Sequence, residues 1–145
     1  TGILGIKGPG MFDAYLVPAT LQKDVLQNGY FLTADFASKA KDGLITIEGR
    51  SKSVINISGL KVFPEEVEAV LEMIPEIKQA RISSSPHQLL GQIIVGEIVL
   101  HKGASIDVED VMQYCKKRLS AFKAPQRLTI VDALPMTKTG KLQRH

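Results

Sequence analysis

The sequence has a single cysteine, Cys115, among its 145 residues. An intramolecular disulfide is therefore excluded, and the composition fits a reducing compartment such as the cytoplasm. The sequence also has no apolar run near the roughly 20 residues that a membrane-spanning helix needs. Its first residues lack the basic start and apolar stretch of a secretion signal. We therefore expect a cytoplasmic protein with no transmembrane segment.

The sequence also has only a small excess of positive over negative charge. It has 18 basic and 15 acidic residues, which give a net charge of +3. An excess this small is common on soluble surfaces, so it does not predict binding to nucleic acid. With 44% hydrophobic and 23% charged residues, the chain falls in the range of ordinary globular proteins.

The residue combinations of several common catalytic sites are missing as well. His87, His101 and His145 are not spaced as metal ligands, and no Ser/His/Asp or Cys/His set can be argued. The segment Thr139-Gly140-Lys141-Leu142 lacks the upstream glycine and the following hydroxyl of a phosphate-binding loop. We therefore predict no metal site, no nucleophilic triad and no Walker motif.

What the sequence does contain divides near Arg50. The first part has an apolar strand at Ile3–Ile6, a short helical candidate at Ala19–Leu26 and an Asn28-Gly29 turn. Asp42-Gly43 precedes the alternating run 44–47, which predicts a tight hairpin whose two turn residues both have positive φ. These few short strands cannot bury both faces of a sheet unaided, so we expect partner strands elsewhere.

The second part alternates strands and helices. Pro64 begins a predicted helix with Glu65 and Glu66 in its first turn, where the helix dipole favours negative charge. A second helix is capped by Ser105 or Asp107 and turns Cys115 inward. Strands are predicted at 54–57, 61–63, 77–83, 93–100 and 127–131. The pattern predicts an α+β domain in which helices flank a roughly three-stranded sheet, with an additional short β-hairpin.

Six segments in a fixed order carry a family resemblance. They are Gly8-Pro9-Gly10-Met11, Asn28 through Asp35, Gly49 through Lys52, Ile57-Ser58-Gly59, Pro64 through Glu68, and Leu134-Pro135 followed by Gly140-Lys141. Together they resemble successive motifs of the AMP-forming acyl-CoA synthetases of the adenylate-forming superfamily. The resemblance implies that residues 1–50 end a large, β-rich amino-terminal domain and that residues 51–145 form a small mobile domain.

The resemblance also implies candidate nucleotide contacts. Asp35 corresponds to a carboxylate that accepts hydrogen bonds from the ribose hydroxyls, and Arg50 to a second nucleotide contact. Without the family, Asp35 reads as a turn aspartate and Arg50 as part of a surface ion pair. Ala34 replaces the glycine usual before this aspartate and adds a Cβ atom there.

Further roles follow from the same resemblance. Lys52 occupies the hinge about which the small domain rotates, although a solvated lysine also explains it. Ser58 and Gly59 correspond to the loop lining the channel for the CoA thiol arm, and a simple turn is the alternative. Lys61 is assigned to the same CoA channel because its position is often basic near phosphate, and a surface lysine without a specific role explains it equally well.

Lys141 is the predicted catalytic residue. The family places its working lysine directly after a glycine, as in Gly140-Lys141, whereas Lys138 is interpreted as a solvated loop charge. A compact cation on a flexible stem can reach a phosphate and a carboxylate deep in a cleft. Taken without the resemblance, Lys141 is expected to be a frayed residue near the end of the chain.

The implied reaction joins a fatty or other organic acid to CoA with ATP and Mg²⁺. The phosphate loop, the acyl pocket and the Mg²⁺ ligands are expected upstream, in an amino-terminal domain that is the main partner of this chain. The chain alone is therefore expected to be inactive. Two alternatives are an adenylation domain that loads a carrier protein and a catalytically silent interaction module. The sequence upstream of Thr1 distinguishes enzyme from module, because a phosphate loop there favours the enzyme.

Overall fold

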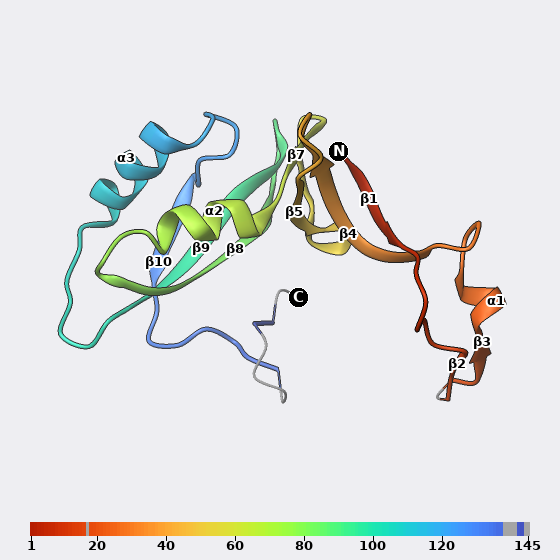
Figure 1. The fold of residues 1–145 in the computed structure, drawn as a ribbon. Coiled ribbons are helices and arrows are strands. Elements are labelled where there is room, and N and C mark those ends of the chain that lie inside the picture. Colours follow the sequence, from red (N-terminus) through yellow and green to blue (C-terminus); the bar gives the residue numbers. More distant parts are fainter. Residues whose placement is uncertain (17, 138–141, 144–145) are drawn as a thin grey trace. The chain divides into compact units, whose positions relative to one another are not determined.

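A computed structural model describes residues 1–16, 18–137 and 142–143 of the chain (Figure 1). It divides into two compact units, Thr1–Lys52 and Ser53–His145. None of the helices in the described residues has the length and apolar character needed to cross a membrane. The interpretation of the first unit as the end of a larger domain stays a prediction.

The first unit is built from short antiparallel strands. Its main sheet has the order β1-β4-β5, and β2 and β3 form a separate two-stranded ribbon before the short helix α1. The bounds are β1 Gly2–Ile6, β2 Ala14–Tyr15, β3 Thr20–Leu21, α1 Gln22–Val25, β4 Phe31–Lys39 and β5 Ile45–Arg50. Gly49 is the only residue that is buried among those described in this unit. The unit by itself therefore has no hydrophobic core in its described part.

The helix predicted at residues 19–26 is shorter in the structure. Thr20 and Leu21 pair with the Ala14–Tyr15 strand, which leaves four residues for α1. The sequence pattern over these eight residues gave no sign of this pairing, because a strand of only two residues is too short to show alternation of apolar and polar side chains.

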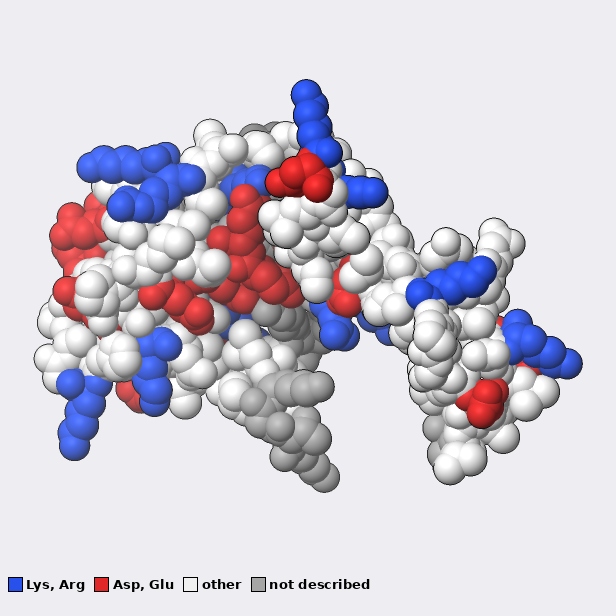
Figure 2. Space-filling view, in the orientation of Figure 1, with Lys and Arg blue, Asp and Glu red and all other residues white. Residues whose placement is uncertain are grey.

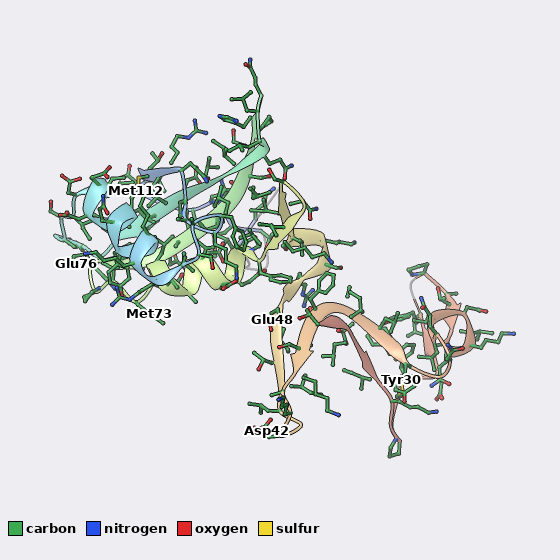
Figure 3. The ribbon with its side chains drawn as sticks, turned by 90° about the horizontal axis from the view of Figure 1, so that it is seen from above. Tyr30, Asp42, Glu48, Met73, Glu76 and Met112 are labelled. Atoms are coloured by element: carbon green, nitrogen blue, oxygen red, sulfur yellow. The ribbon has the colours of Figure 1, made fainter. Side chains whose placement is uncertain are left out.

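The hairpin between β4 and β5 confirms the strand reversal predicted at Asp42-Gly43, but the turn differs from the prediction. Gly43 N donates to Ala40 O at 3.0 Å, and Ala40 N donates to Leu44 O at 2.9 Å. Of the two predicted turn residues, only Gly43 has positive φ, at +92°. Asp42, near the tip of the hairpin in Figure 3, accepts a hydrogen bond from Leu44 N at 3.0 Å. The expectation of positive φ at both residues was wrong, because the register Lys39↔Ile45 leaves a loop longer than the two-residue turn that requires it.

The second unit has the predicted fold class. Its sheet has the order β10-β9-β8, with β8 antiparallel and β10 parallel to β9. The bounds of its elements are β6 Ile55–Ile57, β7 Leu60–Val62, α2 Pro64–Leu71, β8 Ile77–His87, β9 Gly91–Leu100, α3 Val108–Arg118 and β10 Arg127–Ile130. Strands β8 and β9 are longer than predicted because their pairing continues to His87 and Gly91.

Both helices of this unit begin as the sequence predicts. Pro64 is at the start of α2, after the extended residue Phe63. The Asp107 carboxylate accepts a hydrogen bond from Glu109 N at 2.8 Å, so Asp107 rather than Ser105 caps α3. Figure 2 shows basic side chains gathered over α3, whose last turn carries Lys116, Lys117 and Arg118, and acidic side chains over α2.

The hydrophobic core lies between the helices and one face of the sheet. Fifteen buried residues form it: Ile55, Ile57, Val62, Val67, Leu71, Ile74, Ile77, Ala80, Ile82, Ile94, Ile98, Val111, Cys115, Leu119 and Leu128. Cys115 is fully buried, as predicted, and loss of solvation raises the pKa of its thiol to about 11.

Helix α2 also supplies hydrogen bonds to strand β8, which lies at the edge of the sheet. The carboxylate of Glu68, only 6% exposed, accepts a hydrogen bond from Ile82 N at 2.8 Å. Glu72 accepts one from Ala80 N at 3.1 Å. Glu68 of α2 and Glu72, the residue that caps the end of this helix, therefore satisfy backbone donors that an edge strand otherwise presents to solvent.

Candidate functional site

Asp35 and Arg50 lie opposite each other on the neighbouring strands β4 and β5. Arg50 Nε lies 2.9 Å from Asp35 Oδ1, and the two side chains are 71% and 18% exposed. The half-buried carboxylate is thus oriented by a guanidinium that is itself mostly in solvent. A carboxylate held in this way retains lone pairs that can accept hydrogen bonds from paired hydroxyls. The structure brings the two predicted nucleotide contacts together, and their role stays a prediction.

The backbone beside Asp35 has an unusual conformation. Ala34 has φ of +62°, in the left-handed region that glycine adopts at least cost. Asp35 N donates to Thr33 Oγ1 at 3.2 Å, and the same hydroxyl donates to Leu4 O at 3.2 Å. Two hydrogen bonds therefore fix the strand directly before the carboxylate. The local geometry expected of a glycine is kept although the residue is alanine.

Lys52 lies in the middle of a single 3₁₀ turn, Ser51–Ser53, that joins the two units. Its side chain is exposed, and Ser53 at the end of the turn is half-buried. A short turn of this kind has few hydrogen bonds to break, so a change in backbone torsion here is possible at small cost. The hinge role of Lys52 stays a prediction.

Ser58 and Gly59 form the two-residue turn of the hairpin β6–β7. Their φ values are +48° and +87°, and the flanking residues Ile57 and Leu60 are paired. Two consecutive positive φ values at a two-residue loop define a type I′ turn, which suits the twist of the strands. A Cβ atom added to Gly59 would meet no other atom within 4 Å. The turn is exposed and leaves the glycine backbone open to an approaching group.

Lys61 lies on the same hairpin, where it pairs in register with Asn56. Its side chain is exposed. The structure therefore places the three predicted channel residues, Ser58, Gly59 and Lys61, on one short hairpin. The buried residues Ile55, Ile57 and Val62 anchor this hairpin to the core of the second unit.

Lys141, the predicted catalytic residue, lies outside the described residues, as does its comparison residue Lys138. The described residues on either side of the segment 138–141 are hydrogen-bonded to each other. Met136 and Leu142 form an antiparallel bridge, and Gln143 N donates to Pro135 O at 2.9 Å. Both ends of the segment with the predicted lysine are therefore held together by backbone contacts.

The sequence interpretation missed one side chain that contacts Gln143, namely Arg81. Its Nη1 donates to Gln143 O at 2.9 Å, and its Nε donates to Glu97 Oε2 at 2.8 Å. The alternation of Arg81 with the buried residues Ala80 and Ile82 indicates that it faces away from the core. Its partners Glu97 and Gln143 lie 16 and 62 residues further along the chain, and no local sequence pattern predicts either contact.

The described residues offer no cluster of three or more His, Cys, Asp or Glu side chains that could hold a metal ion. No Mg²⁺ ligand is therefore assigned among them. The expectation that the ligands lie upstream of this chain stays a prediction.

Comparison with known proteins gives consistent relatives. Residues 66–141 match the family described as the AMP-binding enzyme C-terminal domain. A probable CoA ligase of Humulus lupulus is 37% identical over 144 residues, which cover 99% of this chain and 27% of that protein.

Two solved structures resemble the chain closely. The o-succinylbenzoate CoA synthetase of Bacillus subtilis, in complex with an acyl-adenylate intermediate, has a TM-score of 0.90 at 28% identity. That match covers 99% of this chain and 29% of the other. ATP-bound MatB of Rhodopseudomonas palustris has a TM-score of 0.80 at 29% identity, over 98% and 28% of the two chains. The chain thus spans less than a third of each of these three proteins.

Proposed function

This chain belongs to the family of AMP-binding enzyme C-terminal domains, and we propose that it is the carboxy-terminal part of an ATP-dependent, AMP-forming carboxylate–CoA ligase. The proposed reaction has two halves. The carboxylate attacks the α-phosphorus of ATP, which releases pyrophosphate and forms an acyl-adenylate. The CoA thiol then attacks the acyl carbon, and AMP leaves. The relative named a probable CoA ligase and the similar structures with ATP and an acyl-adenylate support this sequence of steps.

The chain's own residues have distinct roles in this proposal. Asp35, oriented by Arg50, accepts hydrogen bonds from the ribose hydroxyls of the nucleotide. Lys141 places its positive charge beside the phosphate and carboxylate oxygens, where negative charge develops during adenylation. Rotation about Lys52 then brings the hairpin turn with Ser58 and Gly59 to the thiol arm of CoA, and Lys61 lies near a phosphate of CoA.

The match of the family over residues 66–141 is the observation that carries the proposal, because it runs from helix α2 to the Gly140-Lys141 pair. ATP is accompanied by Mg²⁺, whose ligands we place upstream of this chain. The acid is proposed only as a carboxylic acid of the fatty or other organic class.

The test is to follow pyrophosphate, AMP and thioester in the full-length protein. With a panel of carboxylic acids, ATP and CoA, we expect pyrophosphate release that depends on the acid, and one AMP for each thioester formed. If pyrophosphate release depends on the acid but the acyl group is transferred only to a carrier-protein thiol, the acceptor is a carrier protein and not CoA. If no acid in the panel causes pyrophosphate release, the ligase proposal is refuted, and a catalytically silent interaction module becomes the favoured function.

A further inference from the structure

The face of the sheet opposite the core carries a paired arginine. Arg81 on β8 lies directly across from Glu97 on β9. Its Nε and Nη2 lie 2.8 and 2.5 Å from the same carboxylate oxygen of Glu97, and the two side chains are 19% and 35% exposed. The pair lies in a depression of about 110 Å³, lined also by Ser83, Val95, Gly96, Arg127 and Thr129. Glu97 therefore fixes the plane of the guanidinium group.

The third nitrogen of the same guanidinium points to another part of the chain. Arg81 Nη1 donates to the backbone carbonyl of Gln143 at 2.9 Å. Gln143 N in turn donates to Pro135 O, and Met136 is bridged to Leu142. One side chain thus connects two strands of the sheet to the residues that close both ends of the segment 138–141.

We propose that Arg81 is a positioning residue for adenylation, which acts through Gln143, two residues after Lys141, by holding Gln143 to the sheet. The inference rests on the proposed function, in which Lys141 stabilises the first half-reaction. Arginine suits this task because its rigid, planar fork can contact Glu97 and Gln143 simultaneously through different nitrogens. Lysine has a single nitrogen on a flexible stem and cannot reproduce both contacts with the same geometry.

The effect of losing this contact is expected in the rate rather than in binding. A catalytic group that is displaced by a fraction of an ångström to about 1 Å loses between a few-fold and roughly a hundredfold in rate. Because Arg81 acts through one hydrogen bond to the carbonyl of Gln143, an exposed residue, we expect a loss on the order of tenfold.

The experiment uses the full-length protein with the variants Arg81→Met and Arg81→Lys, and Arg127→Met as the matched control in the same depression. Adenylation is measured by pyrophosphate release, and the second half by conversion of presynthesised acyl-adenylate to thioester. We expect Arg81→Met to lower kcat of adenylation roughly tenfold, with KM for ATP and the thioester rate near wild type. Arg81→Lys should not restore the rate, and Arg127→Met should leave both halves unchanged.

A double variant separates this inference from the proposed function. If Arg81 acts through Lys141, Arg81→Met should add almost nothing to the adenylation defect of Lys141→Ala. Additive defects, or equal losses in both halves, would show that Arg81 has only a structural role and overturn the inference. A normal adenylation rate in Arg81→Met would do the same. A normal rate in Lys141→Ala would instead refute the proposed role of the lysine.

Discussion

A bulky substitution at Gly59 tests the proposed thiol channel, and the same substitution at Gly103 serves as a control with similar backbone strain. In the hairpin turn, Gly59 has φ of +87° and no atom within 4 Å of an added Cβ. Gly103, in the loop before α3, has φ of +80° and equally open surroundings. A tryptophan at either position therefore meets similar backbone strain, and its Cβ atom meets no other atom within 4 Å.

The cost of that strain can be estimated from the backbone conformation. A residue with a Cβ atom in the left-handed region loses about 1–2 kcal/mol relative to glycine. Both Gly59→Trp and Gly103→Trp should thus lower the free energy of unfolding by this similar amount. Only the first places a large ring beside the turn that we assign to the CoA thiol arm. We expect Gly59→Trp to slow thioester formation at least about tenfold, which is a barrier increase of about 1.4 kcal/mol.

The assay measures each half-reaction of the full-length enzyme separately. Gly59→Trp should convert presynthesised acyl-adenylate to thioester slowly and release pyrophosphate at nearly the normal rate, whereas Gly103→Trp should leave both rates near wild type. Equal loss of both halves in Gly59→Trp, or an equal thioester defect in Gly103→Trp, would refute the channel assignment. In either case the strain of the turn, and not obstruction of a thiol, would explain the result.

Three further predictions concern other residues. Lys141→Ala should lower the adenylation rate by a hundredfold or more, about 3 kcal/mol, while presynthesised acyl-adenylate is still converted to thioester; a larger adenylation defect in Lys138→Ala would overturn the assignment. Lys52→Pro should slow one half-reaction and spare the other, because fixing φ resists rotation, and unchanged rates in both halves would remove Lys52 from the hinge. For Cys115, the pKa of the folded thiol is raised from its ordinary value of 9.0 to about 11. The unfolded thiol ionises first, so the free energy of unfolding should fall as pH rises from 9.0 to about 11, by up to about 1.4 kcal/mol per pH unit. Chemical denaturation measures this slope, and the same slope in Cys115→Ala would contradict the cause.

Local rules predicted the second unit well because its signals are local. Pro64 and Asp107 mark helix starts through their own covalent and hydrogen-bonding properties, and the helical spacing of apolar residues correctly placed Cys115 in the core. The family resemblance drawn from the order of the motifs is confirmed by the match over residues 66–141. The three-stranded sheet with two helices and a hairpin is confirmed as well.

The errors and omissions of the sequence interpretation arise where contacts between residues far apart in the sequence determine the structure. Asp42-Gly43 has the composition of a two-residue turn, but the register Lys39–Ile45 leaves a longer loop in which Asp42 bonds through its side chain. Arg81 could be placed on the outer face of its strand by alternation. Its contacts with Glu97 and Gln143 depend on strand register and on the return of the chain end, which no local pattern encodes.

Glu68 of helix α2 and its cap residue Glu72 also affect how another molecule could pair with the edge of the sheet. Glu68 and Glu72 occupy the outward N–H groups of Ile82 and Ala80 on the edge strand. A strand from another molecule adds to a sheet by pairing with such groups, so it would first have to displace two carboxylates. We therefore expect these two carboxylates to hinder the addition of another strand at the β8 edge of the sheet.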